Sequence, residues 1–418
     1  MSTTASPGSV LIIVENLPVP FDRRVWMEAT TLRRAGWEVS VISPTGRECE
    51  DAFEELEGVR IHRHDLPPEG HGLAGYVREY TSALWGEARL ARRVWRGGQR
   101  FGVVHVCNPP DLLFLVAGWY KLLHGVRVVY DQHDIMPELF EAKFRRRGPA
   151  YWVVRLAERL TYATADMVIA TNDSYRQLAL TRGRKRDEDV VVVRSAPDLE
   201  RFQRLEDRRR VRRGRPFCVG YVGVMGPQEG LDHLLRAIHI IVQDHERHDI
   251  IFMLIGDGPS RPSLEELARE LGVAEYLEFT GRVRDEELIR RISACDVCVN
   301  PDPRNPFNDA STMNKILEYM SLGVPVVQFD LTEGRRSAGA ASVYAAPNDE
   351  RDLALKLLET LDDAAARERM AREGMNRMKE ELEWRHQAPK LLAAYERLRG
   401  RAGKGHLIPW LPVSRPGS

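Results

Sequence analysis

The stretch Asp309-Ala-Ser-Thr-Met-Asn-Lys-Ile-Leu-Glu-Tyr-Met-Ser-Leu-Gly-Val-Pro-Val-Val327 predicts a turn, a helix and a buried strand in direct succession. It opens with small hydrogen-bonding residues that can cap a helix: Asp309, Ser311 and Thr312. The helix is expected to run from about Met313 to Ser321 and to stop at Gly323, because glycine is favoured just past a helix end. The apolar run at 325–329 then predicts a strand.

The start of this helix is suited to binding an anion. Free backbone N–H groups and the positive end of the helix dipole point outward there together. Lys315 and Glu318 are three residues apart and therefore lie on one face. A cation and a carboxylate in this arrangement suit a ligand that carries both phosphate and hydroxyl groups, such as a nucleotide sugar.

Length and composition bound the rest of the chain. With 418 residues it is long enough for two domains, each with its own core. Its 61 Lys and Arg balance 61 Asp and Glu, so nucleic acid is not expected as a partner. Five cysteines without regular spacing indicate a reducing compartment. Cys295 and Cys298 are expected to face opposite ways along a buried strand.

The apolar segments favour a cytoplasmic protein, either soluble or peripheral to the inner face of a membrane. No run reaches the length of a membrane span, and residues 10–14 are too short for a secretion signal. The segment 84–96 carries arginines on one side and Trp85 and Trp95 elsewhere, as a basic interfacial helix does. A helix with its apolar side in the core explains it as well, so peripheral contact with an anionic membrane stays open.

Strand-like and helical segments alternate along the first half of the chain. The expected strands are 10–14, 37–43, 59–63, 103–107, 126–130, 167–170 and 190–193. The expected helices are 23–35, 74–96, 111–123, 149–163 and 173–181. The loop after the first strand lacks a GxGxxG fingerprint, so no dinucleotide is implied.

The same alternation restarts after a basic connection at about 200–215. The expected strands are 217–222, 250–255, 277–280, 296–300, 325–329 and 342–344, and the expected helices are 230–244, 261–271 and 350–398. The pattern predicts an α/β fold with two Rossmann-like, doubly wound domains facing each other across a cleft. We place the domains at 1–205 and 206–385, with a helix at 386–405 packing back on the first domain and a tail at 406–418.

Six motifs occur in the order found in one enzyme family. They are Phe21-Asp-Arg-Arg-Val-Trp26, Asp131-Gln-His-Asp-Ile-Met-Pro-Glu138, Gly220-Tyr-Val-Gly-Val-Met-Gly-Pro-Gln-Glu-Gly-Leu-Asp-His-Leu-Leu235, Leu254-Ile-Gly-Asp-Gly-Pro259, Phe279-Thr-Gly-Arg-Val283 and Lys315-Ile-Leu-Glu-Tyr-Met320. In this order the chain resembles family-4 glycosyltransferases, which are retaining, nucleotide-sugar-dependent enzymes with the GT-B fold. The resemblance implies that the first domain takes the acceptor and the second the donor.

The resemblance also implies a donor site in the second domain. Glu318 matches the carboxylate that accepts hydrogen bonds from the donor ribose, and Lys315 is expected to stabilise the leaving diphosphate. Arg282 and Val283 match the place where the nucleobase is held. The remaining expected donor contacts come from a glycine-rich loop and the helix start: Gly223, Val224, Gly226, Ser311, Thr312, Met313 and Asn314.

In the first domain the resemblance singles out His133, which follows a strand and is expected to approach the donor sugar. We therefore predict His133, Lys315 and Glu318 as catalytic residues. Contacts to the acceptor or the sugar are predicted, on weaker grounds, for a set of charged residues: Asp22, Arg24, Asp134, Glu138 and Asp309. Asp131 could help to orient His133.

Two departures from the family pattern concern the phosphate contacts. A glutamate common eight positions before Glu318 is replaced by Ala310, and the adjacent Asp309 is a possible substitute. The usual arginine and lysine of the glycine-rich loop are replaced by Val224 and Glu229, so Glu229 must point away, bind a sugar hydroxyl or be paired. The missing positive charge has four candidate sources: Arg194, Arg282, Arg304 and Lys315.

These observations predict a hexosyltransferase-type enzyme of glycan or polysaccharide biosynthesis. It would move a sugar from a nucleotide-diphosphate donor to a hydroxyl of a glycan, a lipid-linked molecule or a small molecule. The sugar nucleotide is a co-substrate, and neither a cofactor nor a metal is expected. Two alternatives remain open: a sugar-nucleotide epimerase of the same fold, and a non-catalytic nucleotide-sugar-binding protein.

Overall fold

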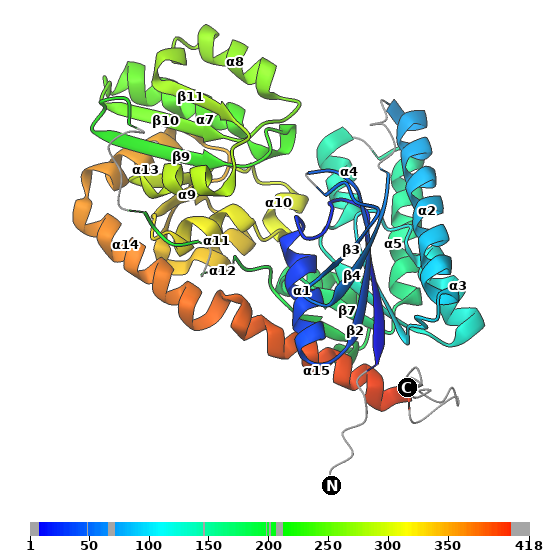
Figure 1. Ribbon diagram of the computed structural model, residues 1–418. Helices are drawn as coiled ribbons and strands as arrows, with labels where there is room; N and C mark the ends of the chain where they lie inside the picture. The colour runs from blue at the N-terminus through cyan, green and yellow to red at the C-terminus, as the bar shows by residue number, and fades with distance from the viewer. Residues whose placement is uncertain are drawn as a thin grey trace. The chain divides into compact units, whose positions relative to one another are not determined.

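The computed structural model describes residues 8–47, 49–65, 72–144, 147–197, 199, 202–205 and 212–402 (Figure 1). The chain divides into two compact units. The first consists of Met1–Glu141, Arg145–Arg194 and Arg385–Ser418, and the second of Ala142–Phe144 and Ser195–Trp384. The predicted tail at 406–418 lies outside the described residues, as do 403–405 of the predicted last helix and 200, 201 and 206–211 of the predicted connection. Among the described helices, none combines the length and the hydropathy needed to cross a membrane.

The first unit is built on an eight-stranded sheet in the order β3-β4-β2-β1-β5-β6-β7-β8. Its strands are β1 (Ser9–Val14), β2 (Glu38–Pro44), β3 (Phe53–Leu56), β4 (Val59–His64), β5 (Val103–Cys107), β6 (Arg127–Gln132), β7 (Met167–Ala170) and β8 (Val190–Val192). All neighbouring strands pair in parallel except β3, which pairs antiparallel with β4 at the edge. Strand β7, and β1 after Ser9, read as continuous apolar runs because a parallel sheet is covered on both faces.

The helices of the first unit lie between these strands in sequence. They are α1 (Arg23–Arg34), α2 (Gly72–Arg96), α3 (Phe114–His124), α4 (Met136–Phe144), α5 (Pro149–Thr164), α6 (Asp173–Thr181) and, from the end of the chain, α15 (Trp384–Ala402). Helix α15 contributes to this unit's core through Tyr395, whose ring packs edge-on against Trp37 at 5.1 Å between centroids.

The second unit is built on a six-stranded parallel sheet in the order β11-β10-β9-β12-β13-β14. Its strands are β9 (Phe217–Val222), β10 (Ile250–Ile255), β11 (Leu277–Gly281), β12 (Val297–Asn300), β13 (Val326–Phe329) and β14 (Ser342–Ala345). Its helices are α7 (Leu231–His239), α8 (Arg261–Glu270), α9 (Asp285–Ser293), α10 (Pro306–Ala310), α11 (Asn314–Ser321), α12 (Thr332–Ala338), α13 (Glu350–Asp362) and α14 (Ala364–Arg377).

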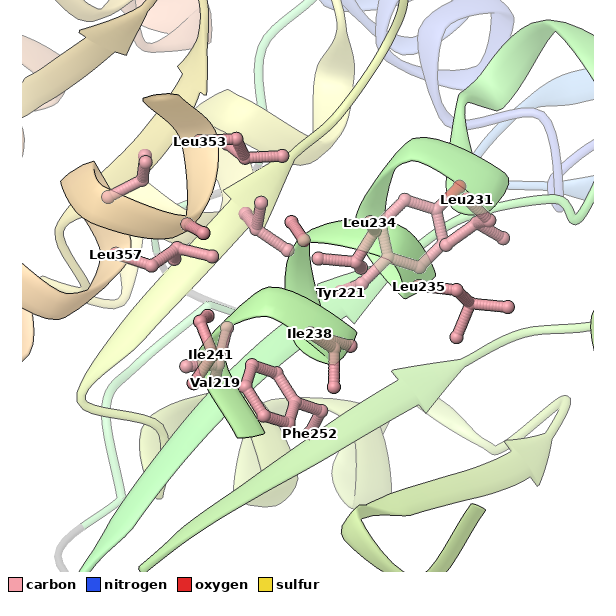
Figure 2. Packing of buried hydrophobic residues seen from close by; sticks show 14 of the residues in the cluster. Val219, Tyr221, Leu231, Leu234, Leu235, Ile238, Ile241, Phe252, Leu353 and Leu357 are labelled. Carbon is pink, nitrogen blue, oxygen red and sulfur yellow. The ribbon is translucent and has the colours of Figure 1, made fainter. Parts of the chain in front are cut away.

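The main core of the second unit lies between the sheet and the helices α7 and α13. Figure 2 shows Val219 and Tyr221 of β9 and Phe252 of β10 packed under the apolar side of α7. Leu353 and Leu357 of α13 close the same cluster. This packing fixes the position of β9, so the loop that leaves its carboxyl end starts from a rigid base.

The two doubly wound sheets confirm the predicted fold class, and three local predictions were wrong. The edge strand β3 was missed, because its sequence Phe-Glu-Glu-Leu is mostly polar and exposed. The helix expected over 350–398 is interrupted at Asp363 and Glu383, where the backbone leaves the helical conformation. Cys295 lies in the turn before β12 rather than in the strand. Cys295 and Cys298 therefore do not face opposite ways, and a Cβ at Gly220 would lie 2.6 Å and 3.2 Å from their sulfur atoms.

In both sheets the strand order reverses beside the first strand. The chain moves outward from β1 through β2 and β4 and then continues on the other side from β5. It moves outward from β9 through β10 and β11 and then continues from β12. Open α/β sheets bind their ligands at such a reversal, outside the carboxyl ends of the strands. Each unit therefore has one place where a site is expected.

Candidate active site

In the second unit the loops that leave β9 and β12 are packed tightly together at the reversal point. Gly230 has a φ of 65°, and a Cβ there would lie 2.0 Å from the carbonyl oxygen of Pro301. Asn308 ties the same loops together by donating from Nδ2 to the carbonyl oxygen of Gln228 at 3.0 Å. Tyr319 of α11 accepts a hydrogen bond from the backbone N–H of Val222 at 2.8 Å. Helix α11 is therefore held directly against the end of β9.

Lys315 lies at the centre of this arrangement, in the first turn of α11. Its ammonium group donates to Glu229 Oε2 at 2.8 Å and to Asp302 Oδ1 at 3.0 Å. The same Nζ lies 4.9 Å from the centroid of the Tyr221 ring, a cation–π distance. Glu229 comes from the loop after β9 and Asp302 from the loop after β12. We call Lys315, Glu229 and Asp302 the lysine cluster.

The electrostatics of the lysine cluster hold a cation in a buried place. Burial alone lowers the pKa of Lys315, but Asp302 and Glu229 more than offset it, so this pKa lies well above its usual range. Burial raises the pKa of Asp302 to about 6, although Lys315 opposes the shift. One ammonium between two carboxylates leaves a net charge of −1 when all three groups are ionised. Near neutral pH, Asp302 is therefore the group that can take up a proton.

The start of α11 differs from the prediction. Met313 is the N-cap residue, and its own side chain makes no capping hydrogen bond. Neither Ser311 nor Thr312 occupies the N-cap position. Ser311 is the C-cap residue of α10, where its Oγ donates to the carbonyl oxygen of Phe307 at 2.7 Å, and Thr312 precedes the N-cap residue. Asn314, the first residue of α11, is exposed. The capping prediction was wrong because residues 306–310 form a separate short helix, α10, with its own end.

Asp309 serves a neighbouring helix. Its carboxylate accepts from the backbone N–H and the hydroxyl of Thr332, at 3.0 Å and 2.9 Å, where α12 begins. The suggestion that Asp309 replaces the glutamate missing at Ala310 therefore has no support in the geometry. Glu318 lies one turn after Lys315 on α11 and is partly buried.

The other residues predicted around the donor lie on the same edge of the sheet or outside this unit. Gly223 and Gly226 flank Val224, whose side chain is 54% exposed, in the loop after β9. Arg282 is exposed and Val283 half-buried in the loop after β11. Of the remaining candidate cations, Arg304 lies 3.7 Å from Asp309, and Arg194 of the first unit donates to Asp173 at 3.3 Å.

The first unit also holds a buried cation at its reversal point. Arg24, in the first turn of α1, donates from Nε and Nη2 to the two carboxylate oxygens of Asp131, at 2.9 Å and 2.7 Å. It also lies 3.1 Å from Glu28 Oε1 and donates to the carbonyl oxygen of Val193 at 2.9 Å. A guanidinium with two parallel bonds to one carboxylate is fixed in orientation.

His133 is attached to this arrangement directly after β6. Its Nε2 is hydrogen-bonded to Asp131 Oδ2, and its backbone N–H donates to Asn108 Oδ1 at 2.7 Å. Burial alone lowers the pKa of His133, but the Asp131 carboxylate outweighs burial and raises it above the usual range. Asp131 therefore holds the ring, as the sequence suggested, and favours its protonated form.

A second layer lies behind Asp131. His105 of β5 lies 3.6 Å from Glu28 and 3.8 Å from Asp131, and its Nδ1 is 2.7 Å from the hydroxyl of Tyr395 on α15. Burial and the nearby Asp131 raise the pKa of Glu28 to about 7. We call Arg24, Glu28, His105, Asp131 and His133 the arginine cluster.

By spacing alone, three members of this cluster and the neighbouring Cys107 resemble a metal site. Glu28, His105, Cys107 and Asp131 have ligand atoms within 4.8 Å of one another. The guanidinium of Arg24 already lies within 3.1 Å of both carboxylates. A metal ion there would face a fixed positive charge, so the groups do not fit a divalent cation. Arg24 fills the cation's role.

The remaining residues predicted to contact the acceptor have structural partners. Asp22 caps α1 by accepting from the backbone N–H of Val25 at 3.1 Å. Glu138 pairs with Arg182 at 2.6 Å. The backbone N–H of Asp134 donates to Asn108 Oδ1 at 3.1 Å, which fixes the turn after His133.

Sequence reasoning missed Asp302 of the lysine cluster, Glu28 and His105 of the arginine cluster, and Tyr395 beside His105. Asp302 carries a usable signal, because it follows the apolar strand β12 by two residues and therefore lies at the carboxyl edge of the sheet. Glu28 lies one helical turn after Arg24, which is also readable. Tyr395 has no such signal, since 290 residues separate it from His105.

Two doubly wound parallel sheets in tandem, each with polar groups at its reversal point, define the GT-B class of two-domain enzymes. Residues 22–196 match the family model described as "Glycosyl transferase 4-like domain", and residues 216–363 match "Glycosyl transferases group 1". The chain belongs to this family of glycosyltransferases. The predicted class of enzyme, a glycosyltransferase of the hexosyltransferase type, is thereby confirmed.

Known proteins of this kind are similar over most of their length. The 2-deoxystreptamine glucosyltransferase of Streptomyces kanamyceticus is 28% identical over 356 residues, which is 82% of this chain and 89% of that protein. The fold matches sucrose-phosphate synthase from Thermosynechococcus elongatus with a TM-score of 0.77 at 18% identity, covering 94% and 100% of the two chains. It matches Anabaena HepE, solved with UDP and glucose, with a TM-score of 0.69 at 16% identity, covering 95% and 100%.

Proposed function

We propose that this enzyme is a retaining glycosyltransferase that uses a nucleotide-diphosphate sugar and an acceptor hydroxyl. Support for the donor class comes from the HepE structure with UDP and glucose and from the glucosyltransferase among the relatives. The observation that carries the proposal is the buried ammonium of Lys315, held between Glu229 and Asp302 beside the glycine-rich loop of β9.

Each element of this site has a role in the proposed reaction. The diphosphate replaces Glu229 as a partner of Lys315, and Asp302 takes up a proton. The ammonium group of Lys315 thereby becomes available to the phosphates. Glu318 accepts hydrogen bonds from the ribose hydroxyls, as an ionised carboxylate can. Gly223 and Gly226 let the loop backbone approach the ligand, since no Cβ stands in the way.

The chemical step transfers one glycosyl group. The bond between the anomeric carbon and the diphosphate oxygen breaks, and a bond from that carbon to the acceptor oxygen forms on the same face. The acceptor proton passes to the leaving diphosphate, whose charge Lys315 stabilises. His133, whose pKa Asp131 raises, stays the predicted catalytic residue of the first unit. No pair of glycosidase-type carboxylates is needed for this route.

The test has two stages. A panel of nucleotide sugars is screened for an increase in melting temperature, because a ligand that binds only the native state stabilises it. With the donor found, release of nucleoside diphosphate is measured with candidate acceptors, and NMR compares the anomeric configuration of product and donor. We expect retention, and loss of turnover in Glu318→Gln. Inversion, or full activity of this variant, would contradict the proposal.

A non-catalytic nucleotide-sugar-binding protein is the second candidate, and one observation favours it. The charge of Lys315 is already compensated by two carboxylates, while Val224 and Ala310 replace groups usual in the family. This candidate predicts stabilisation by a donor without turnover on any acceptor. A sugar-nucleotide epimerase would instead convert the donor to a new epimer with no acceptor present, so product analysis separates all three.

We also propose a cytoplasmic location with peripheral attachment to the inner face of a membrane. The contact predicted for residues 84–96 is supported by the exposure of Trp85, Arg89, Arg92 and Arg96 on one side of α2. The apolar side of the same helix packs into the core through Leu90 and Val94. A lipid-linked acceptor would be consistent with such a location.

A further inference from the structure

Large apolar side chains are exposed along one side of two neighbouring helices in the first unit. They are Leu115, Trp119, Leu122 and Leu123 on α3, and Trp152, Val153, Leu156 and Leu160 on α5. Trp119 is 62% exposed, Leu122 86% and Trp152 64%. In each helix the spacing of three or four residues places the set on one face. We call these eight residues the apolar face.

The two helices belong to one continuous surface. A Cβ at Gly118 of α3 would lie 3.7 Å from Thr164 Cγ2 of α5, and Lys121 Nζ donates to the carbonyl oxygen of Thr164 at 2.8 Å. On its other side α3 packs against α2 (Figure 1). A groove of about 1110 Å³ lies there, lined by both Trp85 and Trp119. Scattered exposed apolar residues are ordinary, but a contiguous set marks a binding surface.

The charge on this surface has a single sign. In α2 from Leu84 to Arg96, and throughout α3 and α5, the acidic residues are Glu87 and Glu158, and both are buried. Arg89, Arg92 and Arg96 are exposed on α2 and line the groove. They form no ion pair within the described part of the chain. A surface with exposed apolar side chains, tryptophans and arginines without acidic neighbours is complementary to a negatively charged layer that has an apolar interior.

We propose that the apolar face docks on an anionic lipid bilayer, with the side chains of α3 and α5 inserted among the acyl chains and the arginines of α2 at the headgroups. Tryptophan favours the membrane–water boundary, and arginine can keep its charge at the headgroups while its stem lies in apolar surroundings. A protein partner would equally cover apolar residues, but it would gain nothing from a wholly basic surround unless it were itself acidic. The inference sharpens the proposed peripheral attachment, on which it rests, by moving the insertion from α2 to α3 and α5.

The test uses the whole chain and vesicles of defined composition. Binding is measured by co-flotation with vesicles of phosphatidylcholine alone and with vesicles that also contain phosphatidylglycerol. We expect stronger binding to the anionic vesicles. The double variant Trp119→Glu with Leu122→Glu should lose about tenfold or more of the binding, because two inserted apolar groups become charged. Replacing Arg89, Arg92 and Arg96 by Gln should weaken binding to anionic vesicles roughly fivefold for each arginine.

The control is Leu355→Glu on α13, which introduces the same charge at an exposed leucine of the second unit. It should bind vesicles as the unaltered protein does. All the variants change exposed side chains, so their melting temperatures should stay unchanged. The proposal is overturned if the unaltered protein binds neither kind of vesicle, or if the Trp119 and Leu122 variant binds as well as the Leu355 control. It is also overturned if light scattering without lipid shows that the unaltered protein is an oligomer and that only the Trp119 and Leu122 variant is monomeric. The apolar face would then be an interface between copies of the chain.

Failure of this inference can be told apart from failure of the proposed reaction. Donor stabilisation and turnover are measured without lipid in the same variants, and they should not change. Loss of vesicle binding with intact turnover supports the docking surface alone. An enzyme without turnover that still binds vesicles through Trp119 and Leu122 contradicts the proposed reaction and leaves the docking surface standing.

Discussion

In the first unit Arg24 lies between Asp131 and Glu28, and in the second Lys315 lies between Asp302 and Glu229. Both cations are the second residue of a helix. Asp131 lies near the end of a parallel strand, whereas Glu229 and Asp302 both lie in loops that follow parallel strands. The arginine is bonded at several fixed points, including a backbone carbonyl. The lysine is a single charged point with two partners.

This difference indicates that the two clusters have different roles. A guanidinium with a bidentate carboxylate keeps one geometry, so the arginine cluster can hold His133 in place through Asp131. An ammonium on a flexible stem can change partners, and Glu229 beside it is 18% exposed. The arginine cluster is therefore expected to contribute mainly to stability and positioning, and the lysine cluster to ligand binding.

The largest expected effect is on the stability of the first unit. Arg24→Met leaves Asp131 and Glu28 buried without their cation, and breaking a buried pair in this way costs about 3–5 kcal/mol. Hydrogen exchange of the amides of β1, β5 and β6 measures the free energy of opening locally. Arg34→Met, on the exposed side of the same helix, removes only a surface pair with Glu57 and should cost about 0–1 kcal/mol. If Arg24→Met and Arg34→Met lowered the free energy of opening equally, the arginine cluster would have no special part in stability.

The next effect concerns turnover in the second unit. Lys315→Met should lower turnover by about 10²–10³-fold, as the loss of one group that stabilises developing charge does elsewhere. The stability loss should be smaller than for Arg24→Met, because Asp302 can take up a proton once the ammonium is gone. Steady-state kinetics and hydrogen exchange of β9 and β12 measure the two quantities. Lys356→Met on α13 is the control. Normal turnover in Lys315→Met would show that Lys315 has no role in the reaction.

Much of this comparison was readable in the sequence, for physical reasons. Parallel strands appear as apolar runs because both faces of the sheet are covered, and the buried strands were accordingly predicted. Lys315 and Glu318 were predicted from their spacing on one helix together with the family resemblance. His133 was predicted from the resemblance and from its place directly after a strand. Whether they perform the chemistry stays a prediction.

What could not be read depends on contacts between distant segments. Lys315 pairs with Glu229, which lies 86 positions away in the sequence. The sequence could offer this pairing only as one of three alternatives for Glu229. The exposed apolar face was missed because the sequence predicted these two segments only as helices, without indicating which of their sides is covered. Both sides of α3 are apolar, and only the packing shows which side is left uncovered.

A smaller effect is expected on the ionisation of His133. Asp131→Asn removes the carboxylate that raises the pKa of His133, so this pKa should fall. NMR titration of the ring protons measures it. Asp22→Asn, which keeps the cap of α1, should shift the pKa less. Because the pKa is raised in the folded state, the pair stabilises fully below the unfolded value, and this contribution is lost as pH rises through the folded pKa.

The smallest expected effect tests whether the lysine cluster frees its cation by protonating Asp302. Burial raises the pKa of Asp302 to about 6, so at pH 7 the free enzyme holds it mostly ionised. If the donor diphosphate needs Asp302 neutral, binding takes up about one proton and weakens up to about tenfold per pH unit above that pKa. Calorimetry in buffers of different ionisation enthalpy measures the uptake. The ligand should be a nucleotide sugar, since its diphosphate does not titrate in this range.

Asp302→Asn should abolish this proton uptake and strengthen binding at pH 7 by up to about tenfold, because the cost of protonating the group is gone. Glu229→Gln separates the two carboxylates. It removes the partner that the diphosphate replaces, so it should strengthen binding but leave the proton uptake in place. If the Asp302→Asn variant still takes up a proton on binding, another group receives that proton. The ionisation of the lysine cluster would then be as fixed as that of the arginine cluster. The difference between the two units would in that case lie only in the reach of the side chains, not in their ionisation.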